Sequence, residues 1–123
     1  MTEAIDIKPT LAPYLNEIFA RKVEQVTAID VRNLTSYTDA IIVVTASSSR
    51  QASSIAEHIH INRKKAGNMP LGVEGMQEGT WVLLDFGDVI IHIFNNETKD
   101  FYDIEGLWAN APRIDTSEFN KAG

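Results

Sequence analysis

The sequence predicts an α/β fold in which helices pack on a mixed β-sheet. The run from Ala40 to Ala46 is continuously apolar and rich in β-branched residues, which is typical of a central strand covered on both faces. Residues 81–94 form two more apolar runs around Gly87, which indicates a β-hairpin. Two other segments carry apolar residues at the spacing of one helix face. This order of helices and strands is the basis of the fold prediction.

The first helix is predicted over residues 11–24. Its apolar residues recur every three or four positions: Leu11, Leu15, Ile18, Phe19 and Val23. Thr10 precedes them as an N-cap, and Pro13 falls in the first turn, where its missing N–H costs little. A short strand over 26–31 then leads to the strand at 40–46.

The second helix is predicted to begin in Ser47-Ser48-Ser49, which supplies N-cap candidates. Its apolar stripe has the spacing of one helix face: Ala52, Ile55, Ala56 and Ile59. The basic run 63–65 complements the helix dipole in the last turn, and Gly67 suits the position after the helix end. A strand over 71–73 follows. The link to it from strand 40–46 can be a right-handed parallel crossover.

The chain of 123 residues is predicted to hold one domain over residues 10–111, with a flexible N-terminus (1–9) and a flexible tail (112–123). Thr98 is expected to cap a last helix over about 99–108. The sequence has no cysteine, which excludes disulfides. It also lacks a secretory signal pattern and an apolar run long enough to span a membrane. These features predict a soluble, cytoplasmic protein.

The hairpin around Gly87 has two possible registers. A two-residue turn at Phe86-Gly87 sets Trp81 opposite His92. A three-residue loop with Gly87 in the left-handed conformation instead sets Trp81 opposite Ile91. Phe86 tolerates a positive φ badly, which favours the second register.

Charge is distributed unevenly along the chain, whose net charge is −6. Residues 68–123 carry ten acidic and three basic side chains, a net charge of −7, whereas residues 1–67 have a net charge of +1. An acidic half repels phosphate backbones, so nucleic acid is not expected as the main contact. A basic protein is the better partner. The alternative is a solvated face that only aids solubility.

Catalytic and metal-binding patterns are missing from the sequence. His58 and His60 are two positions apart on a predicted helix and point in different directions, so they do not begin a metal site. The segment Ser47-Ser48-Ser49-Arg50 lacks the glycine-rich run and the lysine of a phosphate loop. Asp85 and Asp88 flank a tight turn, which turn chemistry explains better than a two-metal cleft. We therefore expect no enzyme activity, no metal and no cofactor.

A partner-binding site is predicted at the opening and the turn of the hairpin. Its residues are Glu74, Trp81, Leu83, Asp85 and Asp88. Alternation along the strand places Trp81, Leu83 and Asp85 on one face. Trp81 lies beside Gly79 near a strand end, and a tryptophan and a leucine within an acidic rim are typical of an interaction hot spot. The alternative is that Trp81 is a core residue, as strand aromatics commonly are.

These motifs resemble the ribosomal silencing factor (Iojap-like) family over about residues 12–111. The resemblance lies in Asp30-Val31-Arg32, Asp39, Ser49-Arg50-Gln51 with Ile55-Ala56, Glu74-Gly75, the block 81–94 and the segment 101–108. It implies a nucleotidyltransferase-like fold without the catalytic acids. It further implies binding to the large ribosomal subunit through its fourteenth protein. Such binding would block joining of the small subunit and repress translation when nutrients are scarce.

Three positions depart from the family's usual residues. Ala40 stands where an aromatic residue is common, Lys99 where arginine is usual and Gln25 where aspartate is frequent. Because lysine cannot form the forked contact of arginine, Lys99 would weaken a bidentate bond. Two other functions stay open: a nucleotide-handling enzyme on the same fold, and a self-associating module whose apolar hairpin forms a homodimer interface.

Overall fold

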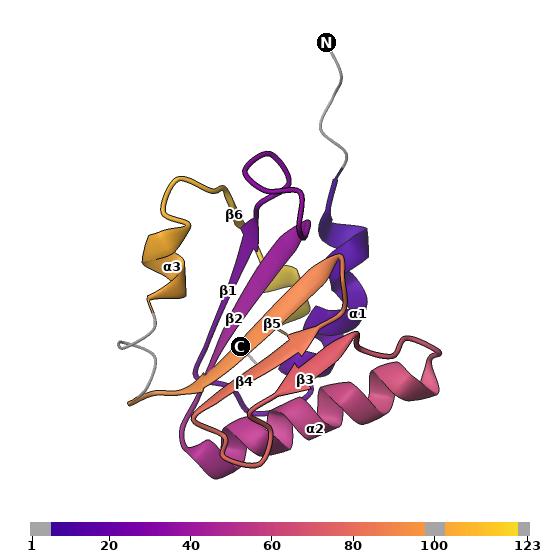
Figure 1. Ribbon diagram of the computed structural model, residues 1–123, viewed down its shortest axis with the longest axis vertical. Coiled ribbons are helices and arrows are strands. Elements are labelled where there is room, and N and C mark those ends of the chain that lie inside the picture. Colours follow the sequence, from indigo (N-terminus) through magenta and orange to yellow (C-terminus); the bar gives the residue numbers. More distant parts are fainter. Residues whose placement is uncertain (1–5, 98–102, 121–123) are drawn as a thin grey trace.

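The computed structural model describes residues 6–97 and 103–120 of the chain. Its elements, in chain order (Figure 1), are α1 (Lys8–Phe19), β1 (Gln25–Asp30), β2 (Ala40–Ala46), α2 (Ser49–Lys65), β3 (Gly72–Glu74), β4 (Trp81–Asp85), β5 (Val89–Asn95), α3 (Ile104–Leu107), β6 (Arg113–Ile114) and the 3-10 helix η2 (Ser117–Phe119). The predicted α/β class, a mixed sheet with packed helices, is confirmed.

The six strands form one sheet in the order β3-β4-β5-β2-β1-β6. β2 pairs with β5 in parallel, and the other neighbouring pairs are antiparallel. It follows that β3 runs in the same direction as β2, with β5 and β4 between them. The chain therefore crosses from β2 through α2 to the far edge of the sheet, and the strand beside β2 is β5.

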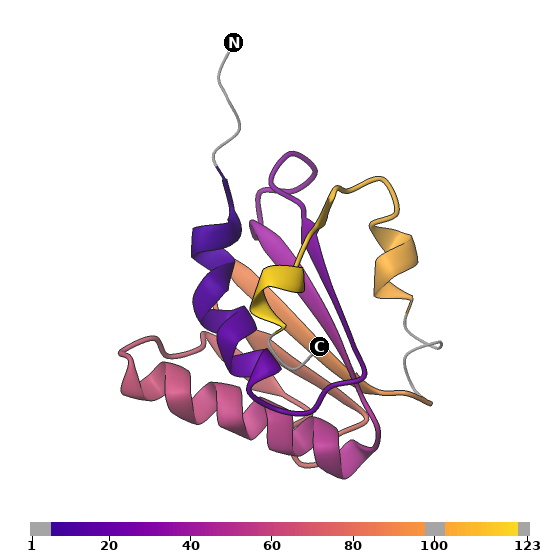
Figure 2. The same cartoon turned by 180° about the vertical axis from the view of Figure 1, so that it is seen from behind.

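One face of the sheet is covered by α1 and α2, which Figure 2 shows in front of the strands. Large aliphatic side chains from both helices and from three strands are fully buried there: Leu11, Leu15, Ile18, Ile55, Ile59, Ile42, Leu84, Ile91 and Ile93. Full burial of such a side chain stabilises the folded state by roughly 1.5–3 kcal/mol. This cluster is the main core of the molecule.

The other face carries a smaller apolar cluster over β1, β2 and β5. Its buried members are Ile29, Val31, Ile41, Val43, Phe94 and Ala111. Ile104, Trp108 and Trp81 pack against this cluster while staying half-buried. Figure 1 shows α3 beside β1, far from the edge of the sheet that β3 and β4 form. β2 is buried along its whole length because it has a cluster on each face, as its sequence predicts.

The start of α1 differs from the prediction. The helix begins at Lys8, and Ile7, rather than Thr10, is its N-cap residue. Pro9 occupies the first turn, where proline fits because the N–H it lacks would have no partner inside the helix. Pro13 therefore lies inside the helix and not in its first turn.

The end of α1 also differs, whereas α2 matches its prediction. α1 ends at Phe19 rather than near residue 24. At the start of α2, the Ser48 side chain accepts a hydrogen bond of 3.0 Å from the Gln51 N–H. After the helix end, Gly67 has a φ of +83°, which favours glycine. The predicted cap and stop of this helix are confirmed.

The observed hairpin register matches neither predicted register. Trp81 lies opposite Phe94, and Leu83 lies opposite His92. Both predictions placed the turn too early along the chain, because both gave Phe86 a place in the connecting loop.

The turn itself consists of Gly87 and Asp88. The Phe86 N–H donates to the Val89 carbonyl at 2.9 Å and closes it. Gly87 is the first central residue and has a φ of +90°, a backbone conformation that favours glycine. Phe86 thus avoids a positive φ and stays at the strand end, where its ring packs against Tyr14 at a centroid distance of 4.9 Å.

The segment after Pro112, predicted to be a loose tail, instead joins the fold. Arg113 lies opposite Ile29 in the pairing of β6 with β1, and the Asp30 N–H donates to the Pro112 carbonyl at 2.9 Å. The free edge of β1 offers backbone groups that a short strand can satisfy. η2 then packs on α1, where Lys8 and Glu118 form an ion pair of 2.8 Å.

The last predicted helix is only partly within the described residues. α3 covers Ile104–Leu107, and the Asp103 side chain caps it by accepting a hydrogen bond of 2.9 Å from the Gly106 N–H. Thr98, the predicted cap, and residues 99–102 lie outside the described residues. The predicted domain limits, 10–111, stay a prediction.

Candidate partner-binding face

A glycine-bounded loop fixes the start of β4. Gly75 and Gly79 have φ values of +75° and +71°, in the region that favours glycine. A Cβ atom on Gly79 would lie 2.1 Å from the carbonyl oxygen of Ser49, at the start of α2. A Cβ atom on Gly75 would lie 2.1 Å from the carbonyl oxygen of Trp81. The loop is therefore pressed against α2 and against the strand it precedes.

The side chains of β4 alternate between the two faces of the sheet, as predicted. Val82 and Leu84 are buried in the main core, whereas Trp81, Leu83 and Asp85 are half-buried. Since the main core lies under α1 and α2, the three half-buried residues are on the other face. β4 is flanked there by the short edge strand β3 and by β5.

Trp81 belongs to a group of three stacked rings on this face. Its ring lies 5.5 Å from that of Phe94 with 23° between the planes, and 5.8 Å from that of His92 with 29°. The rings of His92 and Phe94 are nearly parallel, at 6° and 6.2 Å. The Trp81 Nε1–H also donates to His92 Nδ1 at 2.9 Å. We call Trp81, Leu83, His92 and Phe94 the aromatic face.

His92 is neutral at physiological pH. Its side chain is 6% exposed, and burial lowers its pKa from 6.5 to about 4, because the charged imidazolium is poorly solvated there. A neutral imidazole can accept through one nitrogen. The indole N–H can only donate, so Nδ1 of His92 is the acceptor and Nε2 carries the proton.

Two of the three predicted acidic residues lie on the aromatic face or at its border. Glu74 of β3 is exposed and lies opposite Leu83. Asp85, on the same face at the end of β4, accepts a hydrogen bond of 2.8 Å from the Gly87 N–H through its side chain. Glu74 is thus the acidic group directly beside Leu83, and Asp85 has the role in the turn that its position predicts.

Asp88 lies apart from the aromatic face. Asp88 is exposed in the turn. Burial is the main cause of the raised pKa of the Tyr14 hydroxyl, and the nearby carboxylate of Asp88 adds to the rise. Tyr14 belongs to α1, on the helix-covered side of the sheet. The structure therefore brings together Glu74, Trp81, Leu83 and Asp85, and places Asp88 elsewhere.

The predicted site did not include His92 and Phe94, although the register with the two-residue turn set His92 opposite Trp81 and so on the same face. Both are buried in an apolar strand, so the pattern of the sequence marked them as core. It also missed the exposed apolar residues that lead into and form the edge strand. Met69, Leu71 and Val73 are 53%, 78% and 36% exposed. Exposed apolar side chains near a sheet edge could have been suspected from the shortness of this strand.

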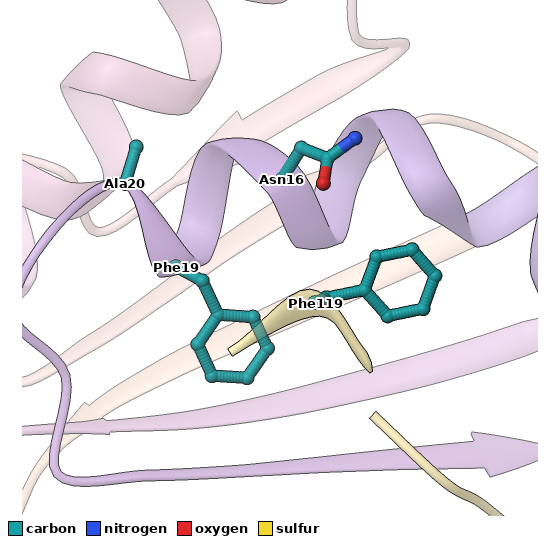
Figure 3. Close-up of a pocket in the computed structure, with 4 residues that line it drawn as sticks. All are labelled: Asn16, Phe19, Ala20 and Phe119. Carbon is teal, nitrogen blue, oxygen red and sulfur yellow. The ribbon is translucent and has the colours of Figure 1, made fainter. Parts of the chain in front are cut away.

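One hollow on the surface, of about 380 Å³, offers little chemistry. It is lined by Asn16, Phe19, Ala20 and Phe119, where η2 meets α1 (Figure 3). Its lining side chains include one amide and no titratable group. Among residues 6–97 and 103–120, no three histidine, aspartate or glutamate side chains gather as a metal site requires. Nor does that part of the chain contain a helix long and apolar enough to cross a bilayer.

Comparison with known proteins identifies the family. The profile of the family described as ribosomal silencing factor during starvation matches residues 5–123. The ribosomal silencing factor RsfS of Chromobacterium violaceum is 39% identical over 87 residues, which cover 71% of this chain and 71% of that protein. The chloroplastic protein Iojap of Zea mays is 32% identical over 114 residues, or 92% of this chain and 48% of that protein.

The fold agrees with this relationship. A crystal structure of a Chromobacterium violaceum protein superposes with a TM-score of 0.79 at 33% identity, and the match covers 85% of this chain and 88% of that one. The family profile spans nearly the whole chain, and the related structure shares its sheet and helices. The chain therefore belongs to the RsfS/Iojap family of ribosomal silencing factors, which are not enzymes.

Proposed function

We propose that this protein binds the large ribosomal subunit and keeps the small subunit from joining it. The contact on the ribosome is the basic fourteenth protein of the large subunit, as the family resemblance implies. Bound there, the factor occupies space that the small subunit needs, and translation is repressed. The observation that carries the proposal is the aromatic face, where half-buried Trp81 and Leu83 lie beside exposed Glu74 on the side of the sheet away from α1 and α2.

The chemistry of this face suits a basic protein surface. A tryptophan and a leucine supply apolar contact area, which dominates the energy of most protein interfaces. Glu74 supplies a negative charge, and the half of the sequence to which it belongs, residues 68–123, has a net charge of −7. Complementary charge accelerates encounter and selects the partner. The same charge disfavours nucleic acid as the main contact.

Two broader expectations belong to the same proposal. The protein acts in the cytoplasm, where it meets ribosomal subunits without contact to a membrane. Its fold is of the nucleotidyltransferase type without the acids that such enzymes use. Asp85 is engaged in the turn and Asp88 lies toward Tyr14, so these two carboxylates do not converge, which supports binding rather than catalysis.

Sucrose gradients of mixed subunits test the proposal. Purified 50S and 30S subunits are combined at a magnesium concentration that supports joining, with and without the protein. We expect the protein to lower the yield of joined ribosomes, and Glu74→Lys to lower it less. Glu57→Lys is the matched control, because Glu57 is an exposed glutamate on α2, away from the aromatic face. An unchanged yield of joined ribosomes with the natural protein would contradict the proposal.

A homodimer is the second candidate. The observation that favours it is the apolar edge of the sheet, where Leu71 is 78% exposed and Val73 is 36% exposed. An uncovered edge strand is a ready site for pairing with another chain. Sedimentation velocity at micromolar concentration decides whether a dimer forms, and Leu71→Lys should then restore the monomer.

A further inference from the structure

The polar group of Trp81 is satisfied within the chain itself. Its Nε1–H donates to His92 Nδ1 at 2.9 Å, and an indole has no other hydrogen-bonding group. A partner that meets Trp81 therefore contacts the carbon surface of the ring, unless the bond to His92 breaks first.

His92 is well suited to hold the ring. It belongs to β5, an interior strand with β4 on one side and β2 on the other, and its side chain is 6% exposed. Its imidazole lies nearly parallel to the Phe94 ring, at 6°. By contrast, Trp81 is the first residue of β4, follows a loop and is half-buried. The fold therefore holds the imidazole in place, whereas the indole depends on its neighbours for its orientation.

The observed register makes this contact diagonal. Leu83, not Trp81, lies directly opposite His92, and Trp81 lies opposite Phe94. Diagonal neighbours across a strand pair are within reach of long aromatic side chains. The indole thus leans over Phe94 toward His92, and the contacts that orient it include the stack on Phe94 at 5.5 Å and the hydrogen bond to Nδ1.

We propose that His92 is the positioning residue of the binding face: its Nδ1 holds the Trp81 indole in the orientation that the partner recognises. This inference rests on the proposed function. Binding sites work best when supporting residues hold the contacting side chains in place before the partner arrives. Without the acceptor, the indole samples other orientations, and part of the binding free energy is lost in ordering it.

Variants at position 92 separate the acceptor from the shape of the side chain. His92→Phe and His92→Leu both remove the hydrogen-bond acceptor, and the two new side chains differ in shape. His92→Asn retains a side-chain acceptor at a distance from the backbone similar to that of Nδ1. Thermal unfolding confirms that each variant is folded before its affinity for purified 50S subunits is measured.

The expected pattern has two parts. His92→Phe and His92→Leu should each weaken binding to 50S subunits by about fivefold or more, and His92→Asn should recover most of that loss. In a Trp81→Phe background, which has no indole N–H, His92→Phe should cause no further loss. A fivefold loss that is the same in the natural background and in the Trp81→Phe background would overturn the inference, because His92 would then act independently of the indole.

A spectroscopic measurement on the free protein completes the test. The chain has two tryptophans, so proton–nitrogen NMR spectra show two indole N–H signals, and Trp81→Phe identifies the one from Trp81. That signal should shift upfield and exchange faster with water in His92→Leu. An unchanged signal overturns the inference. If instead the signal responds but Trp81→Ala binds subunits normally, the positioning contact is real and the proposed binding face is wrong.

Discussion

Gly75 and the carbonyl oxygen of Trp81 are so close that a Cβ atom on Gly75 would lie 2.1 Å from that oxygen. No L side chain fits this space unless the backbone moves. The glycine therefore lets the loop return tightly onto the start of β4, and the placement of Trp81 depends on it.

Replacement of Gly75 by alanine should destabilise the fold and displace Trp81. We expect a loss of roughly 3 kcal/mol in the free energy of unfolding, from left-handed backbone strain and overpacking together. Gly67→Ala is the matched control, because Gly67 also has a positive φ but a Cβ atom there would meet nothing within 4 Å. It should cost roughly 1 kcal/mol. Equal losses in urea unfolding of the two variants would show that the close contact is unimportant.

Trp81→Ala should affect binding more than folding. We expect a loss of about 2 kcal/mol or more in the free energy of binding to 50S subunits, as for buried aromatic hot spots. Thermal stability should fall only slightly, because Trp81 is half-buried at a strand end. Trp108→Ala, at the other half-buried tryptophan of the same face, should leave binding unchanged. A Trp81→Ala protein that loses roughly 3–5 kcal/mol of stability and binds normally once folded would assign Trp81 to the core.

Stability should decrease in acid because of His92. In the unfolded chain its pKa is near 6.5, whereas burial lowers it to about 4 in the folded protein. Between these values the unfolded state binds a proton that the folded state does not. The stability contributed by neutral His92 is therefore complete above pH 6.5, falls as the pH decreases, and levels off below about pH 4. The total loss is roughly 3 kcal/mol.

Chemical unfolding at several pH values measures this dependence. The same series on His92→Leu is the control, because carboxylates titrate in both proteins while the imidazole titrates in only one. The difference in stability between the two proteins should narrow by roughly 3 kcal/mol from about pH 7 to about pH 4. A constant difference would mean that position 92 does not titrate differently in the folded and unfolded states.

Ionic strength should weaken the complex with the large subunit. The acidic half of the chain attracts a basic partner, and exposed charges are screened beyond about 8 Å at physiological salt. The dissociation constant should therefore rise between low and high salt, mainly through a slower association rate. If neither value changes with salt, the acidic residues serve solubility rather than binding.

Elements with a strong local pattern were predictable from the sequence. β2 was located at Ala40–Ala46 because a continuous run of apolar, β-branched residues is typical of a buried central strand. α2 was located by its apolar stripe and its serine cap. The shared face of Trp81 and Leu83 followed from strand alternation alone. Each of these features depends on residues that are near one another in the sequence.

Features that depend on distant contacts were missed. β6 has only two residues, too few for any periodicity, and it exists because the free edge of β1 accepts it. The hairpin register depended on which turn position Gly87 would take. The contact of Trp81 with His92 depended on that register in turn, since it is diagonal in the observed pairing. The place of Asp88 could not be predicted, because alternation does not extend through a turn.

Co-sedimentation with separated ribosomal subunits tests the central claim most directly. The protein is mixed with purified 50S subunits in one tube and purified 30S subunits in another, and the pelleted fraction is measured in each. The proposed function predicts that the protein pellets with 50S subunits and stays in the supernatant with 30S subunits. Equal pelleting with both, or with neither, would contradict it.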